Sequence, residues 1–295
     1  MPATDADLVD VQSAESMRRR ADDVELHVVA AGDPADPLVV LLHGFPDFWY
    51  GWHHQIPALV DAGYRVLVPD QRGYNLSDRP DGLSAYRLGR LSADVAALVE
   101  TAGRDSAHVV GHDWGALVAW DLALRRPSRV NRLGICNVPH PTVFRRTVRS
   151  NPRQLLRSWY VFSFQLPGLP EWYLGRDDAA GVVSALEDTA NPDAFTDEEL
   201  EYYRWAFRRP GAARAAVDWY RAAARRFDPP PRDRVDAPTL VVWGDEDVAL
   251  LPEMADESVE YCADGRLERF PGASHWVHRE RVEDVNDLLV DHLSG

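Results

Sequence analysis

The chain has 295 residues, of which 45% are hydrophobic and 10% aromatic, and this composition fits a folded globular protein with a sizeable core. Its net charge of −15 argues against nucleic-acid partners, which need basic surfaces. The chain contains no long uncharged apolar run, so we expect no membrane span. The acidic stretch 1–23 also lacks the apolar core of a secretory signal peptide.

All 32 basic residues are arginine, and lysine is absent. A GC-rich genome would explain this bias alone, but together with the excess of acidic residues it also indicates a protein adapted to concentrated salt. The two cysteines, Cys136 and Cys262, lie far apart and in no metal-ligand spacing. We therefore predict buried free thiols in a reducing cytoplasm, and no bound metal.

Short apolar runs alternate with helical stretches along the first half of the chain. We expect strands at 24–31, 38–42, 64–68, 109–110 and 130–136, and helices at 52–62, 94–101 and 116–124. The runs at 38–42 and 64–68 are continuous and apolar, which is typical of parallel strands covered on both faces. This alternation predicts a doubly wound, mostly parallel sheet.

The pattern changes between residue 141 and about residue 232. The strand-like runs give way to helical stretches rich in arginine, alanine and aromatic residues, and prolines interrupt them. Strand character returns at 239–243 and 266–270, and an amphipathic helix is expected at 282–292. We therefore predict an α/β core formed by 1–138 and 233–295, with a helical cap inserted at 139–232.

The strand at 109–110 is followed by Gly111-His112-Asp113-Trp114-Gly115, which has the spacing of a nucleophile elbow with aspartate in place of serine. Glycine is needed beside so tight a turn. An aspartate has an ordinary pKa of about 3.9, so Asp113 is ionised at neutral pH and can attack carbon without a base. Taken alone, it would more often be a helix N-cap.

His275 follows the strand at 266–270 and a Pro271-Gly272 turn, which places it on a loop at the carboxyl edge of the sheet, where ligands bind. With an aspartate nucleophile, such a histidine would activate the water that hydrolyses the ester. An acid would orient the imidazole. Asp245, Glu246 and Asp247 all follow the strand at 239–243 and are candidates for this acid.

The order nucleophile, acid, histidine is that of α/β-hydrolases. More specifically, the chain resembles the epoxide hydrolase branch of that fold. The resemblance extends over both halves of the core and rests on His43-Gly44-Phe45-Pro46, Arg72-Gly73-Tyr74-Asn75-Leu76-Ser77, Gly111-His112-Asp113-Trp114-Gly115, Trp243-Gly244-Asp245-Glu246-Asp247 and Gly272-Ala273-Ser274-His275-Trp276.

The resemblance implies a role for several residues. The family's spacing from Gly244 selects Asp247 as the acid, whereas the position after the strand at 130–136, which some relatives use, holds the uncharged Asn137. The backbone N–H groups of Phe45 and Trp114 are implied as the oxyanion hole.

The cap is expected to supply two tyrosines that protonate the alkoxide formed when an epoxide opens. The family's spacing back from Phe-Gln-x-Pro-Gly selects Tyr160, and its Trp-Tyr-Arg pattern selects Tyr220. Both could instead merely pack in an aromatic cap. Tyr173, Tyr202 and Tyr203 are the alternative candidates.

The aromatic residues near these motifs predict an apolar pocket for a small apolar epoxide, with no organic cofactor. The pocket residues that we expect are Phe48, Trp159, Phe164, Trp219 and Trp276. Two other functions remain open: a haloalkane dehalogenase, in which Asp113 attacks carbon and Trp114 holds the halide, and a non-catalytic α/β-hydrolase that binds a small ligand. The oligomeric state, monomer or homodimer, also remains open.

Overall fold

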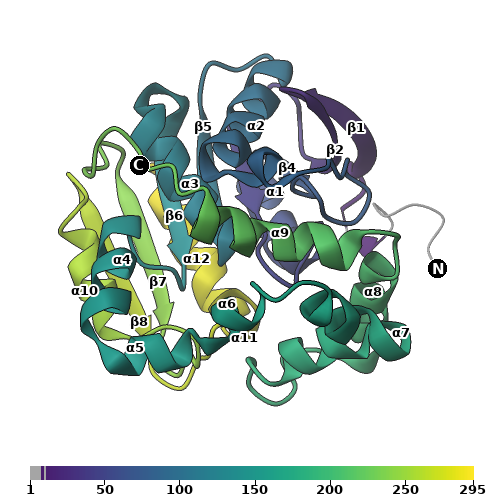
Figure 1. The fold of residues 1–295 in the computed structure, drawn as a ribbon. Helices are drawn as coiled ribbons and strands as arrows, with labels where there is room; N and C mark the ends of the chain where they lie inside the picture. The colour runs from purple at the N-terminus through teal and green to yellow at the C-terminus, as the bar shows by residue number, and fades with distance from the viewer. Residues whose placement is uncertain (1–7, 10) are drawn as a thin grey trace.

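An eight-stranded sheet forms the centre of the computed structural model, which describes residues 8, 9 and 11–295 (Figure 1). Residues 1–7 and 10, part of the stretch in which we expected no signal peptide, lie outside the described residues. The strand order is β1-β2-β4-β3-β5-β6-β7-β8. The pairs β1–β2 and β2–β4 are antiparallel, and all the other neighbouring pairs are parallel. The strands are β1 (Glu15–Ala21), β2 (Val24–Ala31), β3 (Leu38–Leu42), β4 (Arg65–Pro69), β5 (Ala107–His112), β6 (Val130–Cys136), β7 (Thr239–Gly244) and β8 (Gly265–Phe270).

Helices cover both faces of the sheet. From β3, the chain passes through α1 to β4, which lies toward the β1 edge of the sheet. It then moves in the opposite direction, through α2 to β5 and through α3 to β6. Because parallel crossovers are right-handed, these helices lie on opposite faces. The core helices are η2 (Trp49–Trp52), α1 (Gln55–Asp61), η3 (Leu83–Tyr86), α2 (Leu88–Thr101), α3 (Trp114–Arg125), η4 (Pro127–Arg129), α10 (Glu253–Val259), α11 (Val277–Glu280) and α12 (Val282–Ser294).

The predicted fold class is confirmed, and so are the seven predicted strands, of which three have the predicted bounds and four differ from them by one or two residues. β1 was not predicted, because Glu15–Ala21 carries three consecutive arginines and is mostly solvent-exposed. As an edge strand it pairs with β2 on one side only. Its charged side chains protect that edge from pairing with another chain.

Six helices separate β6 from β7 and form a layer that extends across the middle and lower part of the view in Figure 1. They are α4 (Pro141–Ser150), α5 (Pro152–Arg157), α6 (Trp159–Ser163), α7 (Leu169–Glu187), α8 (Asp197–Phe207) and α9 (Ala212–Arg225). We call this segment the cap. Its proposed limits at residues 139 and 232 stay a prediction.

Hydrogen bonds and an ion pair fasten the cap to the core. On one side, Trp219 of α9 donates its indole N–H to the backbone oxygen of Arg72, at 3.0 Å. On the other, Trp276 donates its indole N–H to Thr189 Oγ1 at 2.9 Å. The buried Arg279 guanidinium pairs with Glu199 of α8 at 2.5 Å. The cap is therefore tied to the same loop that carries His275.

Two simpler expectations can be compared with the structure. Cys136 and Cys262 are both free and buried, as predicted. Within the described residues, no helix combines the length and the apolar character that a bilayer crossing requires.

The turn between β5 and α3 depends on glycine, because a Cβ at Gly115 would lie 2.1 Å from the backbone oxygen of Leu42 in β3. We expect Gly115→Ala to lower the free energy of unfolding by about 1 to 3 kcal/mol, since the strand backbone cannot yield easily. Urea unfolding followed by circular dichroism measures this loss. Gly175→Ala is the control: a Cβ there has no atom within 4 Å, so it should be neutral or stabilising. An equal loss in both variants would contradict this explanation.

Candidate active site

Asp113 stands at the tip of a strained turn between β5 and α3. Its backbone has φ 50° and ψ −124°, a conformation that costs a non-glycine residue about 1 to 3 kcal/mol. Glycines surround it: a Cβ on Gly111 would meet the backbone of Gly115 at 2.5 Å, and one on Gly44 would lie 2.3 Å from the Asp113 side chain. The carboxylate thus projects from the end of the sheet into space that Gly44 leaves free.

The loops after β7 and β8 bring Asp247 and His275 to the same edge of the sheet. The imidazole lies between two carboxylates, with Nε2 3.5 Å from Asp113 Oδ2 and Nδ1 2.7 Å from Asp247 Oδ2. Its side chain is only 7% exposed, and that of Asp247 is fully buried. The structure therefore brings together the three residues that the sequence selected from distant segments.

Asn137 helps to fix Asp247. Its side-chain N–H donates to Asp247 Oδ2 at 2.9 Å, while its oxygen accepts from the backbone N–H of Gly244 at 2.8 Å. The backbone N–H groups of Ala249 and Leu250 donate to Asp247 Oδ1. Sequence reasoning considered Asn137 only as a position without charge. A polar residue directly after a buried strand was the signal that could have identified it.

The charges of these three residues shift one another's pKa. Burial would lower the pKa of His275, but the carboxylates of Asp247 and Asp113 outweigh it and raise that pKa to about 10. Burial would raise the pKa of Asp113, but His275 and the backbone N–H of Phe45 hold it below its usual value. The pKa of Asp247 is lowered in the same way by His275 and Asn137. The unreacted site therefore holds an imidazolium between two carboxylates.

One of the two predicted oxyanion donors contacts the Asp113 carboxylate directly. The backbone N–H of Phe45 donates to Asp113 Oδ1 at 2.7 Å. In the described part of the chain, no hydrogen bond joins the Trp114 N–H to this carboxylate. Oδ1 is thus held by the backbone, while Oδ2 lies 3.5 Å from His275 Nε2.

Tyr160 of α6 and Tyr220 of α9 lie near each other, with ring centroids 6.0 Å apart. The Tyr220 ring also meets those of Phe45 and Trp114 edge-on, at 5.4 and 4.9 Å. Burial, followed by the negative charge of Asp113, raises the pKa of both phenols well above the usual value. Both therefore keep their protons at neutral pH, and both sense the charge of Asp113.

A cavity of about 550 Å³ separates the core residues Asp113 and His275 from the cap tyrosines Tyr160 and Tyr220. Its wall also includes two of the predicted pocket residues, Trp159 and Phe164. Of the alternative tyrosines, Tyr173 lines it as well. Tyr203 instead donates its hydroxyl to Asp47, and Tyr202 donates to Glu198.

Phe48, Trp219 and Trp276 do not line this cavity, which differs from the prediction. All three are at most 1% exposed and pack where cap and core meet. Both tryptophans donate their indole N–H groups to hydrogen bonds between cap and core. Phe48 packs edge-on against Tyr203, with ring centroids 5.2 Å apart. The sequence shows that the region is aromatic but not which way each ring points.

Comparison with known proteins shows the family to which this fold belongs. The family model for the alpha/beta hydrolase fold matches residues 37–282. The chain is 43% identical over 272 residues to the AB hydrolase superfamily protein YfhM of Bacillus subtilis, covering 92% of this chain and 95% of that protein. It is 35% identical over 310 residues to epoxide hydrolase A of Mycobacterium tuberculosis, covering 92% and 95%.

Among solved structures, an epoxide hydrolase from Bacillus megaterium in complex with an inhibitor superimposes with a TM-score of 0.87 at 30% identity, covering 95% of this chain and all of that one. The chain belongs to the epoxide hydrolase branch of the α/β-hydrolase family. Members of this family bind ligands at the carboxyl edge of the sheet, and in this chain that edge carries Asp113 and His275.

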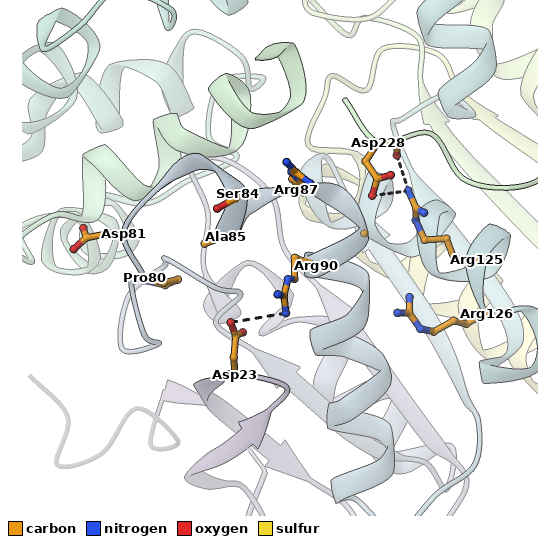
Figure 2. A pocket seen from close by; sticks show the side chains of 11 residues that line it. Asp23, Pro80, Asp81, Ser84, Ala85, Arg87, Arg90, Arg125, Arg126 and Asp228 are labelled. Carbon is orange, nitrogen blue, oxygen red and sulfur yellow. Dashed lines mark hydrogen bonds and ion pairs between the residues drawn. The ribbon is translucent and has the colours of Figure 1, made fainter. Parts of the chain in front are cut away.

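A second cavity, also of about 550 Å³, lies beside the start of α2 and the end of α3 (Figure 2). Its side chains are mainly charged and partly paired: Arg90 contacts Asp22 at 2.8 Å, and Arg125 contacts Asp228 at 3.2 Å. The wall that the structure describes includes no histidine or cysteine. The first cavity differs from it in placing a histidine, His275, beside the carboxylate of Asp113.

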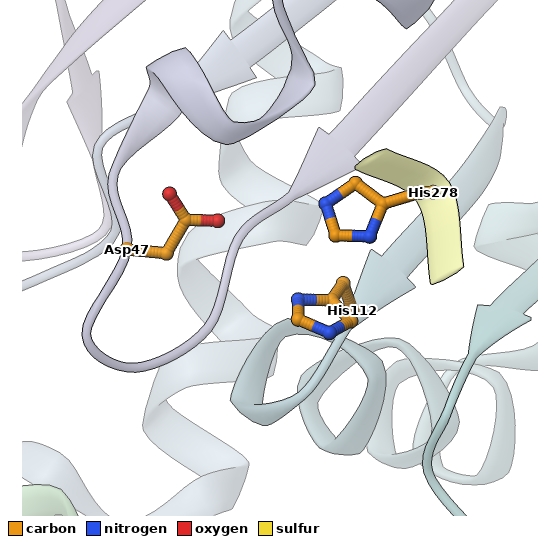
Figure 3. Close-up of side chains that lie close together, drawn as sticks. All are labelled: Asp47, His112 and His278. Atoms are coloured by element: carbon orange, nitrogen blue, oxygen red, sulfur yellow. The ribbon is translucent and has the colours of Figure 1, made fainter. Parts of the chain in front are cut away.

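A buried cluster of Asp47, His112 and His278 lies behind the elbow, and the three side chains converge in Figure 3. One ligand atom from each residue lies within 4.8 Å of the others. Among the residues that the structure describes, Asp47 Oδ2, His112 Nδ1 and both ring nitrogens of His278 have no hydrogen-bond partner. Two histidines and a carboxylate suit a transition metal. One water that donates to Asp47 and His112 and accepts from one ring nitrogen of His278 satisfies three of these four atoms, so this donor set does not by itself indicate a metal.

The charge of Asp113 can be tested through the titration of His275. We expect Asp113→Asn to lower the pKa of His275 by at least about one unit, because an amide carries no negative charge to favour the imidazolium. NMR titration of the imidazole signals measures this. Asp245→Asn is the control, since Asp245 pairs with Arg269 at 2.8 Å and should leave the titration unchanged. An unshifted pKa in Asp113→Asn would disprove the charge coupling.

Proposed function

We propose that this chain is an epoxide hydrolase that adds water to an epoxide and forms a vicinal diol through an ester on Asp113. One observation carries the proposal: two protonated tyrosines, Tyr160 and Tyr220, line the same apolar cavity as a carboxylate that is backed by His275. An epoxide needs both groups at once, because its carbon must be attacked while its oxygen takes up a proton. The relatives named above, two of which are epoxide hydrolases, support the same reaction.

In the first step, Asp113 Oδ2 attacks a ring carbon and the carbon–oxygen bond of the ring breaks. Oδ2 suits this role because Oδ1 is engaged by the Phe45 N–H. The oxygen that leaves takes a proton from Tyr160 or Tyr220, and a neutral ester with a hydroxyl group results. Such proton transfer typically contributes about 10² to 10⁴ in rate.

In the second step, His275 takes a proton from water, and the resulting hydroxide attacks the ester carbonyl. Formation of the ester removes the negative charge of Asp113, which is one of the two charges that raise the pKa of His275. The imidazole can then lose its proton and act as a base. The Phe45 N–H, and in our proposal the Trp114 N–H, stabilise the oxyanion. When the tetrahedral intermediate collapses, the ester bond to the substrate oxygen breaks, and the leaving alkoxide takes the proton of the new Asp113 carboxyl group, so the diol is released and the carboxylate is restored. The tyrosinate takes up the proton that the imidazole gave up.

The ester should accumulate when its hydrolysis is blocked. We expect His275→Gln, incubated with styrene oxide, to gain the mass of one epoxide on a peptide that contains Asp113, because attack needs no base but hydrolysis does. Intact-protein and peptide mass spectrometry measure this. Asp113→Asn serves as the control and should gain no such mass. Absence of the adduct in His275→Gln, with the protein folded and diol still produced, would sink the covalent mechanism.

The tyrosines should act on ring opening rather than on ester hydrolysis. We expect Tyr160→Phe and Tyr220→Phe together to slow formation of the ester by about 10² to 10⁴, with smaller losses in the single variants. Rapid-mixing measurements of tryptophan fluorescence can separate the two steps. Tyr173→Phe, which changes another tyrosine of the same wall, should lose far less. Near-normal ring opening in the double variant would show that these phenols are not the acids.

Two other functions would use the same site, and one assay distinguishes them from the proposed reaction. A haloalkane dehalogenase would release halide from a bromoalkane through Asp113 and Trp114 and would not need the tyrosines. In this cavity the side chain of Phe45 occupies the place where a polar halide donor would help. A non-catalytic binding protein would convert neither substrate. Diol from styrene oxide, with little halide from a bromoalkane, supports the proposed reaction.

We further propose a reducing, salt-rich cytosol as the working environment of this enzyme. The two free, buried cysteines support the reducing compartment, and the charge of −15 without any lysine supports the adaptation to salt.

A further inference from the structure

We propose that the preferred epoxides of this enzyme carry a carboxylate, or a similar anionic group, that binds to Arg157 in the cavity wall. The inference rests on the proposed epoxide hydrolase function and adds a substrate class to it. Arg157 ends α5, three residues before Tyr160, and lines the same cavity as Asp113. The anion would therefore bind on the cap side of the cavity, close in the chain to a tyrosine that receives the epoxide oxygen.

Arg157 is anchored without being neutralised. Its Nη1 donates to the backbone oxygens of Asp247 and Leu250, at 2.7 and 3.0 Å. Among the described residues, no carboxylate forms an ion pair with it, and its Nε and Nη2 groups donate no hydrogen bond. A guanidinium fixed by one nitrogen leaves a rigid pair of N–H donors, which suits a carboxylate.

The neighbouring arginines of the cap differ from Arg157. Arg153, one turn earlier in α5, is 67% exposed and pairs with Glu253, and Arg221 of α9 pairs with Glu171. Arg157 has no acidic partner among the described residues, and it lies in the wall of a mainly apolar cavity. Its positive charge is available to a ligand.

The other charged side chain of the cap that lines the cavity is Asp188, beyond the end of α7. Asp188 is solvent-exposed, so water screens its charge, whereas Arg157 is half-buried and held by two carbonyl groups. The cap side of the cavity therefore favours an anion over a cation. The apolar remainder of the wall suits the hydrocarbon chain that joins the anion to the epoxide.

The experiment compares epoxides that differ only in charge. The substrates are the epoxides of hex-5-enoate, oct-7-enoate and undec-10-enoate, each assayed beside its methyl ester. We expect at least one acid to exceed its ester about tenfold in kcat/KM, mainly through a lower KM, with an optimum chain length set by the reach from Arg157 to Asp113. Because the preference is electrostatic, it should decrease as sodium chloride is raised.

Variants of Arg157 then assign the preference to this side chain. Arg157→Gln should reduce the ratio of acid to ester about tenfold, and Arg157→Lys should keep part of it because the charge remains. Arg153→Gln is the matched control on the same helix and should leave the ratio unchanged. An equal loss for acid and ester in Arg157→Gln would mean that the residue only holds the loop of Asp247, and would overturn the proposal.

The remaining outcomes are also decisive. If wild-type enzyme hydrolyses the esters as well as the acids at every length, the anion site is wrong while the epoxide hydrolase function stands. If it hydrolyses neither series, nor styrene oxide, both proposals fall.

Discussion

The imidazole of His275 lies between the carboxylates of Asp113 and Asp247 in a largely buried site, and the proposed chemistry depends on this arrangement. The carboxylate of Asp247 keeps its negative charge, because it is buried and accepts hydrogen bonds from Asn137 and two backbone N–H groups. In the proposed mechanism, the negative charge of the other is lost when Asp113 becomes an ester. The same imidazole is then a stabilising cation before attack and a base afterwards.

The geometry of the elbow explains why an aspartate can serve at a position that serine often occupies. A serine must lose its proton to a histidine, so the histidine must be neutral at the start. Asp113 is ionised from the outset, and burial does not neutralise it because His275 and the Phe45 N–H compensate its charge. Its strained backbone is held by close packing around Gly44 and Gly115. The packing of the surrounding sheet compensates for the free energy of this strained conformation.

Sequence reasoning was strongest where residue type and chain order carry the information. Continuous apolar runs such as Leu38–Leu42 identify buried strands, and the elbow spacing identifies Asp113. It was weaker where direction matters: Trp219 and Trp276 belong to the cap–core contact, yet composition alone could not distinguish them from Trp159 in the cavity wall. The support from Asn137 and the free guanidinium of Arg157 depend on contacts between distant segments, which one sequence does not show.

The loop that carries His275 has a second role, since its next residue, Trp276, holds Thr189 at the end of α7, and Arg279 holds Glu199 in α8. A displacement of these helices would be transmitted through a few covalent bonds to the imidazole. Entry of a bulky ligand and the position of the His275 imidazole are therefore mechanically linked. A ligand that forces the cap and the core apart would also shift this imidazole as it enters.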